Sequence, residues 1–245
     1  CTRRWQISTI CLRDDLGAVQ SAHSVPTPRL GGLAIVAAFS IGSFLIPGEF
    51  GDATSLLLLC LVPLFAGGLW EDIGKGVSPR RRMALAALST LLAVAAFGVW
   101  VDRVGVPVAD WALGFAPVGI AFTIFAVVGV TNAFNLIDGL DGLCGGLVCV
   151  SLLVLTGLEL AEGHFSDALV IGLMLAAVVG FLRHNLNPAR IFLGDAGSMM
   201  LGFFLATAAT QGGGRRAVVG SILLPLAIAG VPLLDVLLAV WRRSV

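Results

Sequence analysis

Two asparagines and two aspartates within thirteen residues are the first feature of this sequence that could do chemistry. Residues 131–143 read Thr-Asn-Ala-Phe-Asn-Leu-Ile-Asp-Gly-Leu-Asp-Gly-Leu. They follow an apolar run, 117–130, that is long enough with its flanks to cross a bilayer, so Asp138 and Asp141 should lie where that run meets water. Their spacing of three puts both carboxylates on one face if a helix starts here. A polar loop capped by Asn and Asp is the simpler alternative, and this stretch alone leaves both open.

A second polar stretch, residues 185–198, reads Asn-Leu-Asn-Pro-Ala-Arg-Ile-Phe-Leu-Gly-Asp-Ala-Gly-Ser. A turn such as 194–198 ahead of a helix offers free backbone N–H groups to an anion, with the Asp195 carboxylate beside them for a divalent cation. Mg²⁺ prefers one or two carboxylates together with phosphate oxygens and waters. The pattern therefore fits a nucleotide diphosphate with magnesium, although a glycine-rich helix start remains equally open.

The most charged loop, residues 71–82, holds Glu71, Asp72, Lys75 and three consecutive arginines at 80–82. These cations could neutralise phosphate charge or anchor the loop at an anionic leaflet. Arg29 has the same two interpretations. His23 and His184 could handle protons or contact phosphate, although a lone histidine usually does neither.

The composition indicates a polytopic membrane protein of the all-α class. Hydrophobic residues make up 58% and charged residues 12%, and mean hydropathy is +0.98, whereas soluble domains are about 45–50% apolar and about 25% charged. The 31 glycines suit close helix packing in lipid. Because the formal net charge is zero and no basic tract carries interleaved aromatics, nucleic acid is excluded as an expected partner.

Apolar runs predict a single membrane-embedded domain, 1–245, with about eight spans. Twelve of the fifteen basic residues then lie on one side, which the positive-inside rule identifies as the cytoplasm. The predicted cytoplasmic loops are 1–30, 71–82, 132–142 and 183–198. The predicted spans are about 31–47, 54–70, 83–101, 117–131, 143–160 and 168–182, with a seventh ending near 210 and an eighth ending near 240.

Carboxylates gather at the inner ends of these spans, in four separate stretches. Carboxylates at membrane depth are costly unless they are paired, bind a metal or face water, so we expect them to meet in one pocket that opens toward the cytosol. Each one alone could instead be a helix cap or pair with an inner arginine. The residues are Glu71, Asp72, Asp138, Asp141, Asp195 and Asp235.

Four stretches resemble, in the same order along the chain, the cytoplasmic motifs of the polyprenyl-phosphate N-acetylhexosamine-1-phosphate transferases of glycosyltransferase family 4. They are 23–32, 71–80, 132–143 and 185–198. The likeness is greater to the branch that starts O-antigen, common-antigen and teichoic-acid linkage synthesis than to the peptidoglycan branch. It implies a multi-pass protein of the bacterial inner membrane whose active site faces the cytoplasm. The implied reaction transfers sugar 1-phosphate from a UDP-sugar such as UDP-GlcNAc to undecaprenyl phosphate in the bilayer and releases UMP. The implied cofactor is Mg²⁺, with Mn²⁺ as an alternative.

The resemblance also implies roles for individual residues. The expected metal ligand is Asp195, with Asp72 and Glu71 as further acidic contacts, and the expected catalytic residues are Asp72, Asp138 and Asp141. Residues expected to bind substrate are Asn135, Asn185, Phe192, Arg80, His23 and Arg29, with Phe192 placed to stack on uracil.

The chain departs from the family pattern at several points. Glu71 stands where an aspartate is usual, and Gln20 and Ser21 replace a basic pair. The chain also lacks the family's first span and ends before a histidine-rich loop, so we expect a fragment, a divergent member or a sequence clipped at both ends, and a chain that turns over poorly alone. Two other functions stay open: a membrane transporter with inner-face carboxylates, and an inactive relative that acts as a scaffold. A transporter should place its carboxylates near the bilayer midplane. The sugar, the glycan pathway and a homodimer are left undecided.

Overall fold

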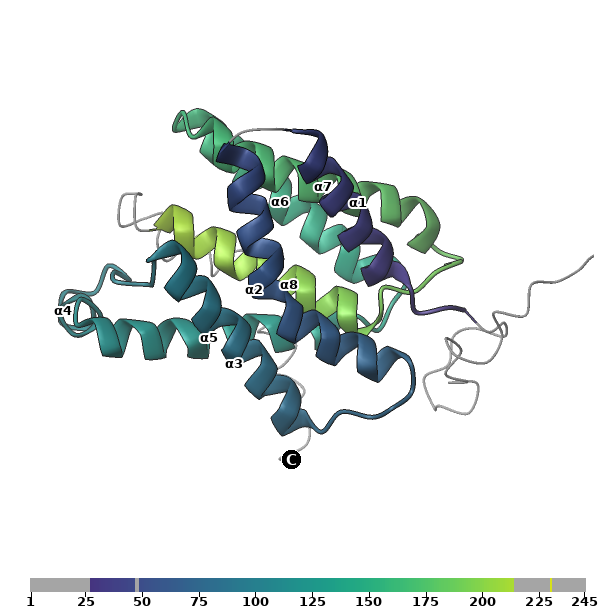
Figure 1. The fold of residues 1–245 in the computed structure, drawn as a ribbon, viewed down its shortest axis with the longest axis horizontal. Coiled ribbons are helices and arrows are strands. Elements are labelled where there is room, and N and C mark those ends of the chain that lie inside the picture. The colour runs from purple at the N-terminus through teal and green to yellow at the C-terminus, as the bar shows by residue number, and fades with distance from the viewer. Residues whose placement is uncertain (1–26, 47–48, 214–229, 231–245) are drawn as a thin grey trace, which may run out of the picture.

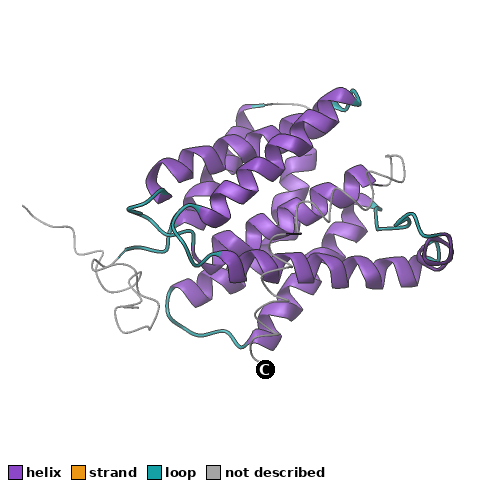
Figure 2. Ribbon diagram, turned by 180° about the vertical axis from the view of Figure 1, so that it is seen from behind, coloured by secondary structure: helices purple, strands orange, loops and turns teal. Residues whose placement is uncertain are grey.

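The computed structural model describes residues 27–46, 49–213 and 230, and within them the chain is all-α, as predicted, with no strand. Figure 2 shows that helices account for nearly all of the described chain. The helices are α1 (Gly31–Leu45), α2 (Glu49–Asp72), α3 (Pro79–Phe97), α4 (Pro107–Leu113), α5 (Ala116–Ile137), α6 (Leu143–Ala161), α7 (Phe165–Asn185) and α8 (Gly194–Gly213).

Four described helices are long and apolar enough to cross a membrane by length and composition: α2 from Gly51, α5, α6 and α7. Helix α1 is a shorter apolar helix of 15 residues. These helices confirm the prediction of a polytopic helical membrane protein. The eighth predicted span lies outside the described residues.

Helix α8 forms the centre of the bundle. Every residue from Ala196 to Leu205 is buried, and the helix packs against α1, α2, α5 and α6 (Figure 1). Phe39 of α1 meets Phe204 of α8 edge to face, with ring centroids 5.8 Å apart. Burying such a helix on all sides requires apolar residues around its whole circumference, and the sequence of α8 supplies them.

The remaining helices form two groups around α8. Helices α6 and α7 form an antiparallel pair, and α1 packs against α7, whereas α3 packs against α2 and α5. We call the end of the bundle at which α8 begins the inner end, and the end that holds the α6–α7 turn the outer end. Helices α2, α5 and α7 finish at the inner end, and α3, α6 and α8 begin there (Figure 1).

The predicted inner loops are shorter in the structure because the helices continue through their polar ends. Helix α5 runs to Ile137, so most of the predicted loop 132–142 is helical, and Asn132 donates its amide to Val128 O within the same helix at 2.8 Å. Arg80, Arg81 and Arg82 lie in the first turn of α3, which Ser78 caps by accepting a hydrogen bond from Arg81 N at 3.4 Å. The predicted outer connection before α5 contains the short helix α4.

Candidate active site

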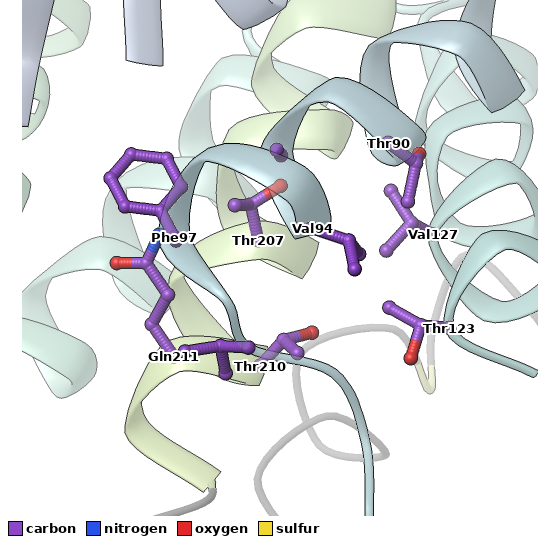
Figure 3. A pocket seen from close by; sticks show the side chains of 10 residues that line it. Thr90, Val94, Phe97, Thr123, Val127, Thr207, Thr210 and Gln211 are labelled. Atoms are coloured by element: carbon purple, nitrogen blue, oxygen red, sulfur yellow. The ribbon is translucent and has the colours of Figure 1, made fainter. Parts of the chain in front are cut away.

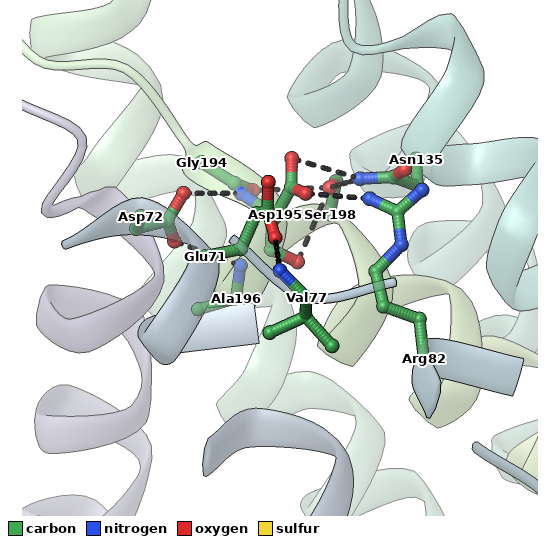
Figure 4. Close-up of polar contacts among 9 residues, drawn as sticks. All are labelled: Glu71, Asp72, Val77, Arg82, Asn135, Gly194, Asp195, Ala196 and Ser198. Atoms are coloured by element: carbon green, nitrogen blue, oxygen red, sulfur yellow. Dashed lines mark hydrogen bonds and ion pairs between the residues drawn. The ribbon is translucent and has the colours of Figure 1, made fainter. Parts of the chain in front are cut away.

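Asp195, in the first turn of α8, is the centre of a polar cluster at the inner end (Figure 4). Its Oδ2 accepts a hydrogen bond from Arg82 Nη1 at 2.7 Å, and its Oδ1 accepts one from Asn135 Nδ2 at 3.2 Å. The same Asn135 amide also donates to Ser198 Oγ at 3.0 Å. Helices α3 and α5 thus each contribute one side chain to the cluster and α8 contributes two, and the charge-assisted bond from Arg82 is the strongest contact.

Asp72, the last residue of α2, caps the start of α8. Its Oδ1 accepts a hydrogen bond from Asp195 N at 2.8 Å, and its Oδ2 accepts one from Ala196 N at 2.9 Å. The first N–H groups of a helix have no partner within that helix, and a carboxylate there is further favoured by the helix dipole. Asp72 is only 4% exposed, so this carboxylate is committed to the backbone that carries Asp195.

Three glycines let α1 and α2 approach this turn closely. A Cβ on Gly68 of α2 would lie 2.5 Å from Ala196 Cα, and one on Gly32 of α1 would overlap Gly197 N. Gly194 has a φ of 77°, and a Cβ there would lie 2.7 Å from Asp72 Oδ2. Only residues without side chains fit these positions, so α1 and α2 hold the first turn of α8 by direct backbone contact.

Asp138 follows α5 as its C-cap residue, within electrostatic reach of the same cluster. The pKa of the Asp138 carboxyl is raised to about 7, first by burial and then by the negative charges of Asp195 and Asp72, against the opposing positive charge of Arg29. Desolvation and nearby like charges both disfavour the ionised form. The structure therefore brings Asp72, Asp138 and Asp195 together at one end of the bundle, as the sequence predicted.

Glu71 and Asp141 make different contacts. Glu71 accepts a hydrogen bond from Val77 N, which closes the turn between α2 and α3. Asp141 Oδ2 accepts from Ala189 N at 3.0 Å and from Asn187 Nδ2 at 3.4 Å. These contacts hold the loops that surround Asp195.

Asn185 also ties loops together. Its Oδ1 accepts a hydrogen bond from Gly142 N at 3.0 Å, and its Nδ2 donates to Ile191 O at 2.9 Å. The side chain is buried, and both ends of its amide are bonded to backbone. Asn185 therefore links the start of α6 to the loop before α8; the prediction that it contacts substrate is not tested by these bonds.

The N-terminal motif reaches this region through the backbone. Phe192 N donates to Pro28 O at 2.9 Å, Gly31 N donates to Phe192 O at 2.9 Å and Gly32 N donates to Leu193 O at 2.9 Å. This short ladder sets Arg29 and Phe192 beside the cluster. His23 lies outside the described residues.

Arg82, and not Arg80, contacts a carboxylate of this cluster; the prediction that Arg80 binds substrate is not tested by this contact. Arg80 and Arg81 are exposed, because successive residues on a helix are rotated by about 100°. The Nε of Arg82 is buried with no hydrogen-bond partner among the described residues. The position of Arg82, one turn after the start of α3, directs its side chain toward Asp195. The sequence alone does not identify Arg82, because its direction depends on where the helix begins.

The family model of glycosyl transferase family 4 matches residues 54–213, from within α2 to the end of α8. The match contains Asp72, Arg82, Asn135, Asp138 and Asp195. The chain belongs to glycosyl transferase family 4. This result confirms the resemblance drawn from the four motifs, three of which lie within the matched residues.

Curated members of glycosyl transferase family 4 support the same placement. The chain is 30% identical to the "Probable undecaprenyl-phosphate N-acetylglucosaminyl 1-phosphate transferase" of Bacillus subtilis, covering 91% of this chain and 62% of the relative. It is 33% identical to the "Decaprenyl-phosphate N-acetylglucosaminephosphotransferase" of Mycobacterium tuberculosis, covering 95% and 66%. A "Phospho-N-acetylmuramoyl-pentapeptide-transferase" of Rubrobacter xylanophilus is 34% identical, covering 75% and 60%. The chain thus spans about three fifths to two thirds of the length of these relatives.

The outer end of this family 4 chain has a different character. A pocket between α3, α5 and α8 is lined by Thr90, Thr123, Val127, Thr207 and Gln211 among others (Figure 3). At the α6–α7 turn, His164 Nδ1 lies 3.0 Å from Glu159 Oε2 and 3.6 Å from Glu162 Oε2. No cation from the described residues reaches the threonine pocket, in contrast to Arg82 at the inner end.

Proposed function

We propose that this chain carries the site of a phosphoglycosyl transferase, which moves N-acetylhexosamine 1-phosphate from a UDP-sugar to a polyprenyl phosphate such as undecaprenyl phosphate and releases UMP. The observation that carries the proposal is the Asp195 cluster, in which one carboxylate at a helix start is contacted by Arg82 and Asn135. The names of the curated relatives support the same reaction class.

The residues around Asp195 fit a divalent cation. Asp195 is a hard oxygen donor of the kind Mg²⁺ prefers, and the carboxylates of Asp72 and Asp138 add negative charge nearby. The Arg82 guanidinium, 2.7 Å from Asp195, already balances one of these charges with a cation. We propose Asp195 as the ligand of Mg²⁺, or of Mn²⁺ in its place. When bound, the metal would offset the charge of the diphosphate and make its β-phosphorus a better electrophile.

The transfer needs a nucleophile, a leaving group and groups that bind the charge between them. An oxygen of the polyprenyl phosphate forms a bond to the β-phosphorus of the UDP-sugar, and the bond from that phosphorus to the bridging oxygen breaks, so that UMP departs with the bridging oxygen. Arg82 supplies positive charge and a free Nε donor to the phosphate oxygens. Asn135 orients the Asp195 carboxylate for this role.

Proton handling places few demands on this site. A phosphate that is mostly ionised at neutral pH attacks without a strong base. Asp138, with a pKa near 7, can take the remaining proton when the lipid phosphate arrives in its singly charged form. We propose Asp138 for this proton, Asp141 as the residue that holds loop 187–189 beside it, and Arg29 and Phe192 as neighbours of the nucleotide.

The placement of the carboxylates disfavours a transporter. They lie where α2 and α5 end and α8 begins, whereas a carrier is expected to place its charged site near the middle of broken helices. We propose that this inner end faces the cytoplasm, because the basic residues concentrate there. A scaffold without activity would not need Arg82 and Asn135 to converge on Asp195. A homodimer enters no step of the proposal.

A transfer assay tests the proposal. The purified chain in detergent with undecaprenyl phosphate and labelled UDP-GlcNAc should yield labelled lipid and an equal amount of UMP with Mg²⁺, and neither product with EDTA. The sugar is varied by replacing UDP-GlcNAc with UDP-GalNAc. Product formation that is unaffected by EDTA would contradict the proposed dependence on a metal ion. The absence of product with every UDP-sugar would contradict the proposed transferase activity.

A further inference from the structure

We propose that Asp72 is a positioning residue, which acts on the reaction through helix α8 and not by touching metal or substrate. This inference rests on the proposed function for its consequence in catalysis, but its structural part stands on the geometry of Asp72 alone. The sequence and the family resemblance had placed Asp72 among the metal ligands and catalytic residues.

The first argument is the use of both carboxylate oxygens. Oδ1 accepts from Asp195 N at 2.8 Å and Oδ2 accepts from Ala196 N at 2.9 Å. Both N–H groups belong to the helix start that carries the Asp195 side chain, and neither has a partner within α8. Asp72 therefore fixes the backbone of the residue next to which the metal is proposed to sit.

The second argument is Gly194, which lies directly before Asp195. Its φ of 77° and the 2.7 Å from its virtual Cβ to Asp72 Oδ2 show that the Asp72 carboxylate fills the space where a side chain would be. A methyl group at this position would push the carboxylate off the α8 backbone. Gly194 and Asp72 thus act together to form the cap of α8, although Gly194 has no group that could bind a metal or move a proton.

The third argument is burial. Asp72 is 4% exposed, whereas the side chain of Asp195 is 23% exposed. Of the two carboxylates, Asp195 is open to an arriving ligand, whereas Asp72 is enclosed against the first turn of α8, to whose N–H groups it is bonded. A carboxylate enclosed in this way acts through the backbone N–H groups to which it is bonded.

The test compares Asp72→Asn with Gly194→Ala and with the double variant. Amide hydrogen exchange of the peptide that contains residues 195–196 reports directly on the cap, because these two N–H groups have no other acceptor in α8. We expect exchange there to become about tenfold faster in each single variant. Gly98→Ala is the matched control, since Gly98 has a φ of 65° with nothing within 4 Å of its virtual Cβ, so it adds the same backbone strain away from the site.

The second readout is the response to Mg²⁺. We measure the Mg²⁺ concentration that gives half of the metal-induced rise in melting temperature, and the same concentration for the transfer rate. Each single variant should raise both values about tenfold, as loss of a group that orients a metal ligand does. Because both changes remove the same cap, the double variant should stay within about threefold of the more affected single variant.

Two outcomes would overturn the proposal. One is unchanged amide exchange at 195–196 in Asp72→Asn together with a lost Mg²⁺ response, which would make Asp72 a direct ligand. The other is a double variant whose loss is the product of the two single losses, which would mean that Asp72 and Gly194 act separately. If Asp72→Asn does not fold, Gly194→Ala carries the exchange test, because its methyl group displaces the carboxylate without changing its chemistry.

Failure of the proposed function gives a different pattern. A wild-type chain that forms no labelled lipid would contradict the transferase activity, whereas the amide exchange and the Mg²⁺ dependence of melting would still decide whether Asp72 acts through α8.

Discussion

The inner and outer ends of the bundle each hold a group of acidic and basic side chains, but the two groups are built differently. At the outer end, Glu159, Glu162 and His164 lie within six residues and close one helical turn. At the inner end, Asp72 and Asp195 are 123 residues apart in sequence, and Arg82 and Asp195 are 113 apart. A local cluster stabilises the turn that contains it, whereas the inner cluster exists only when four helices are in place. The difference predicts that the inner residues govern activity and the outer residues govern stability.

The largest expected effect is that of Asp195→Asn. The change removes the carboxylate charge that we propose for the metal but keeps the size of the side chain and its contact with Asn135. We expect transfer to fall about 1,000-fold and the melting temperature without metal to change little, as measured by labelled-lipid formation and thermal unfolding. Glu162→Gln, the same type of change at the outer end, is the control. Equal losses of activity in the two variants would contradict the prediction that only the inner end governs activity.

Arg82→Gln should have the next largest effect. It removes the cation that contacts Asp195 at 2.7 Å, and we expect kcat to fall about 100-fold. Arg80→Gln is the matched control because Arg80 belongs to the same helix turn but is exposed, and its rate should stay within about twofold of the wild type. A larger loss of kcat in Arg80→Gln than in Arg82→Gln would contradict the assignment of Arg82 to the site.

Asp138→Asn tests the electrostatics of the inner end through pH. The folded-state pKa of about 7 lies above the usual value of about 3.9 for an unfolded aspartate. The stability that this group contributes is therefore fully present below about pH 4 and is lost as pH rises through about 7. Asparagine stays neutral, so in EDTA the variant should melt at least about 2–4 °C above the wild type at pH 8 and at the same temperature at pH 4, where the wild-type carboxyl is protonated in both states.

A wild type that is as stable at pH 8 as at pH 4, relative to the variant, would contradict this prediction.

The smallest effect on activity is expected for His164→Gln. The change removes the imidazole between Glu159 and Glu162, and Glu159 is 2% exposed. We expect a loss of about 1–2 kcal/mol in the free energy of unfolding and a transfer rate within about twofold of the wild type. A loss of activity greater than the loss of stability explains would show that the outer end communicates with the site.

The sequence predicted which polar stretches meet, because each one follows or precedes an apolar run that must end at the membrane surface. The gathering of Asp72, Asp138 and Asp195 and the all-α class follow from that pattern alone. The role of each side chain within the gathering does not, since it depends on rotations about helix axes. Arg80 and Arg82 carry the same functional group and differ only in the direction in which each side chain leaves the axis of α3. Asp72 looks like a ligand in sequence, but its two backbone partners lie 123 and 124 residues away.

Helix boundaries were also predicted less accurately from the sequence. Polar residues such as Asn132 and Asn135 suggested a loop, but α5 continues through them to Ile137 because neighbouring helices bury its other face. This extension turns Asn135 toward Asp195.

The contact of Gly32 and Gly68 with Ala196 and Gly197 has a consequence for how this region tolerates change. These two glycines carry no reactive group, yet even one added methyl would meet main-chain atoms that cannot move aside. A saturation survey of the whole chain should therefore rank Gly32 and Gly68 as intolerant as Asp195, and a designer who wishes to alter the donor or acceptor must leave all three untouched.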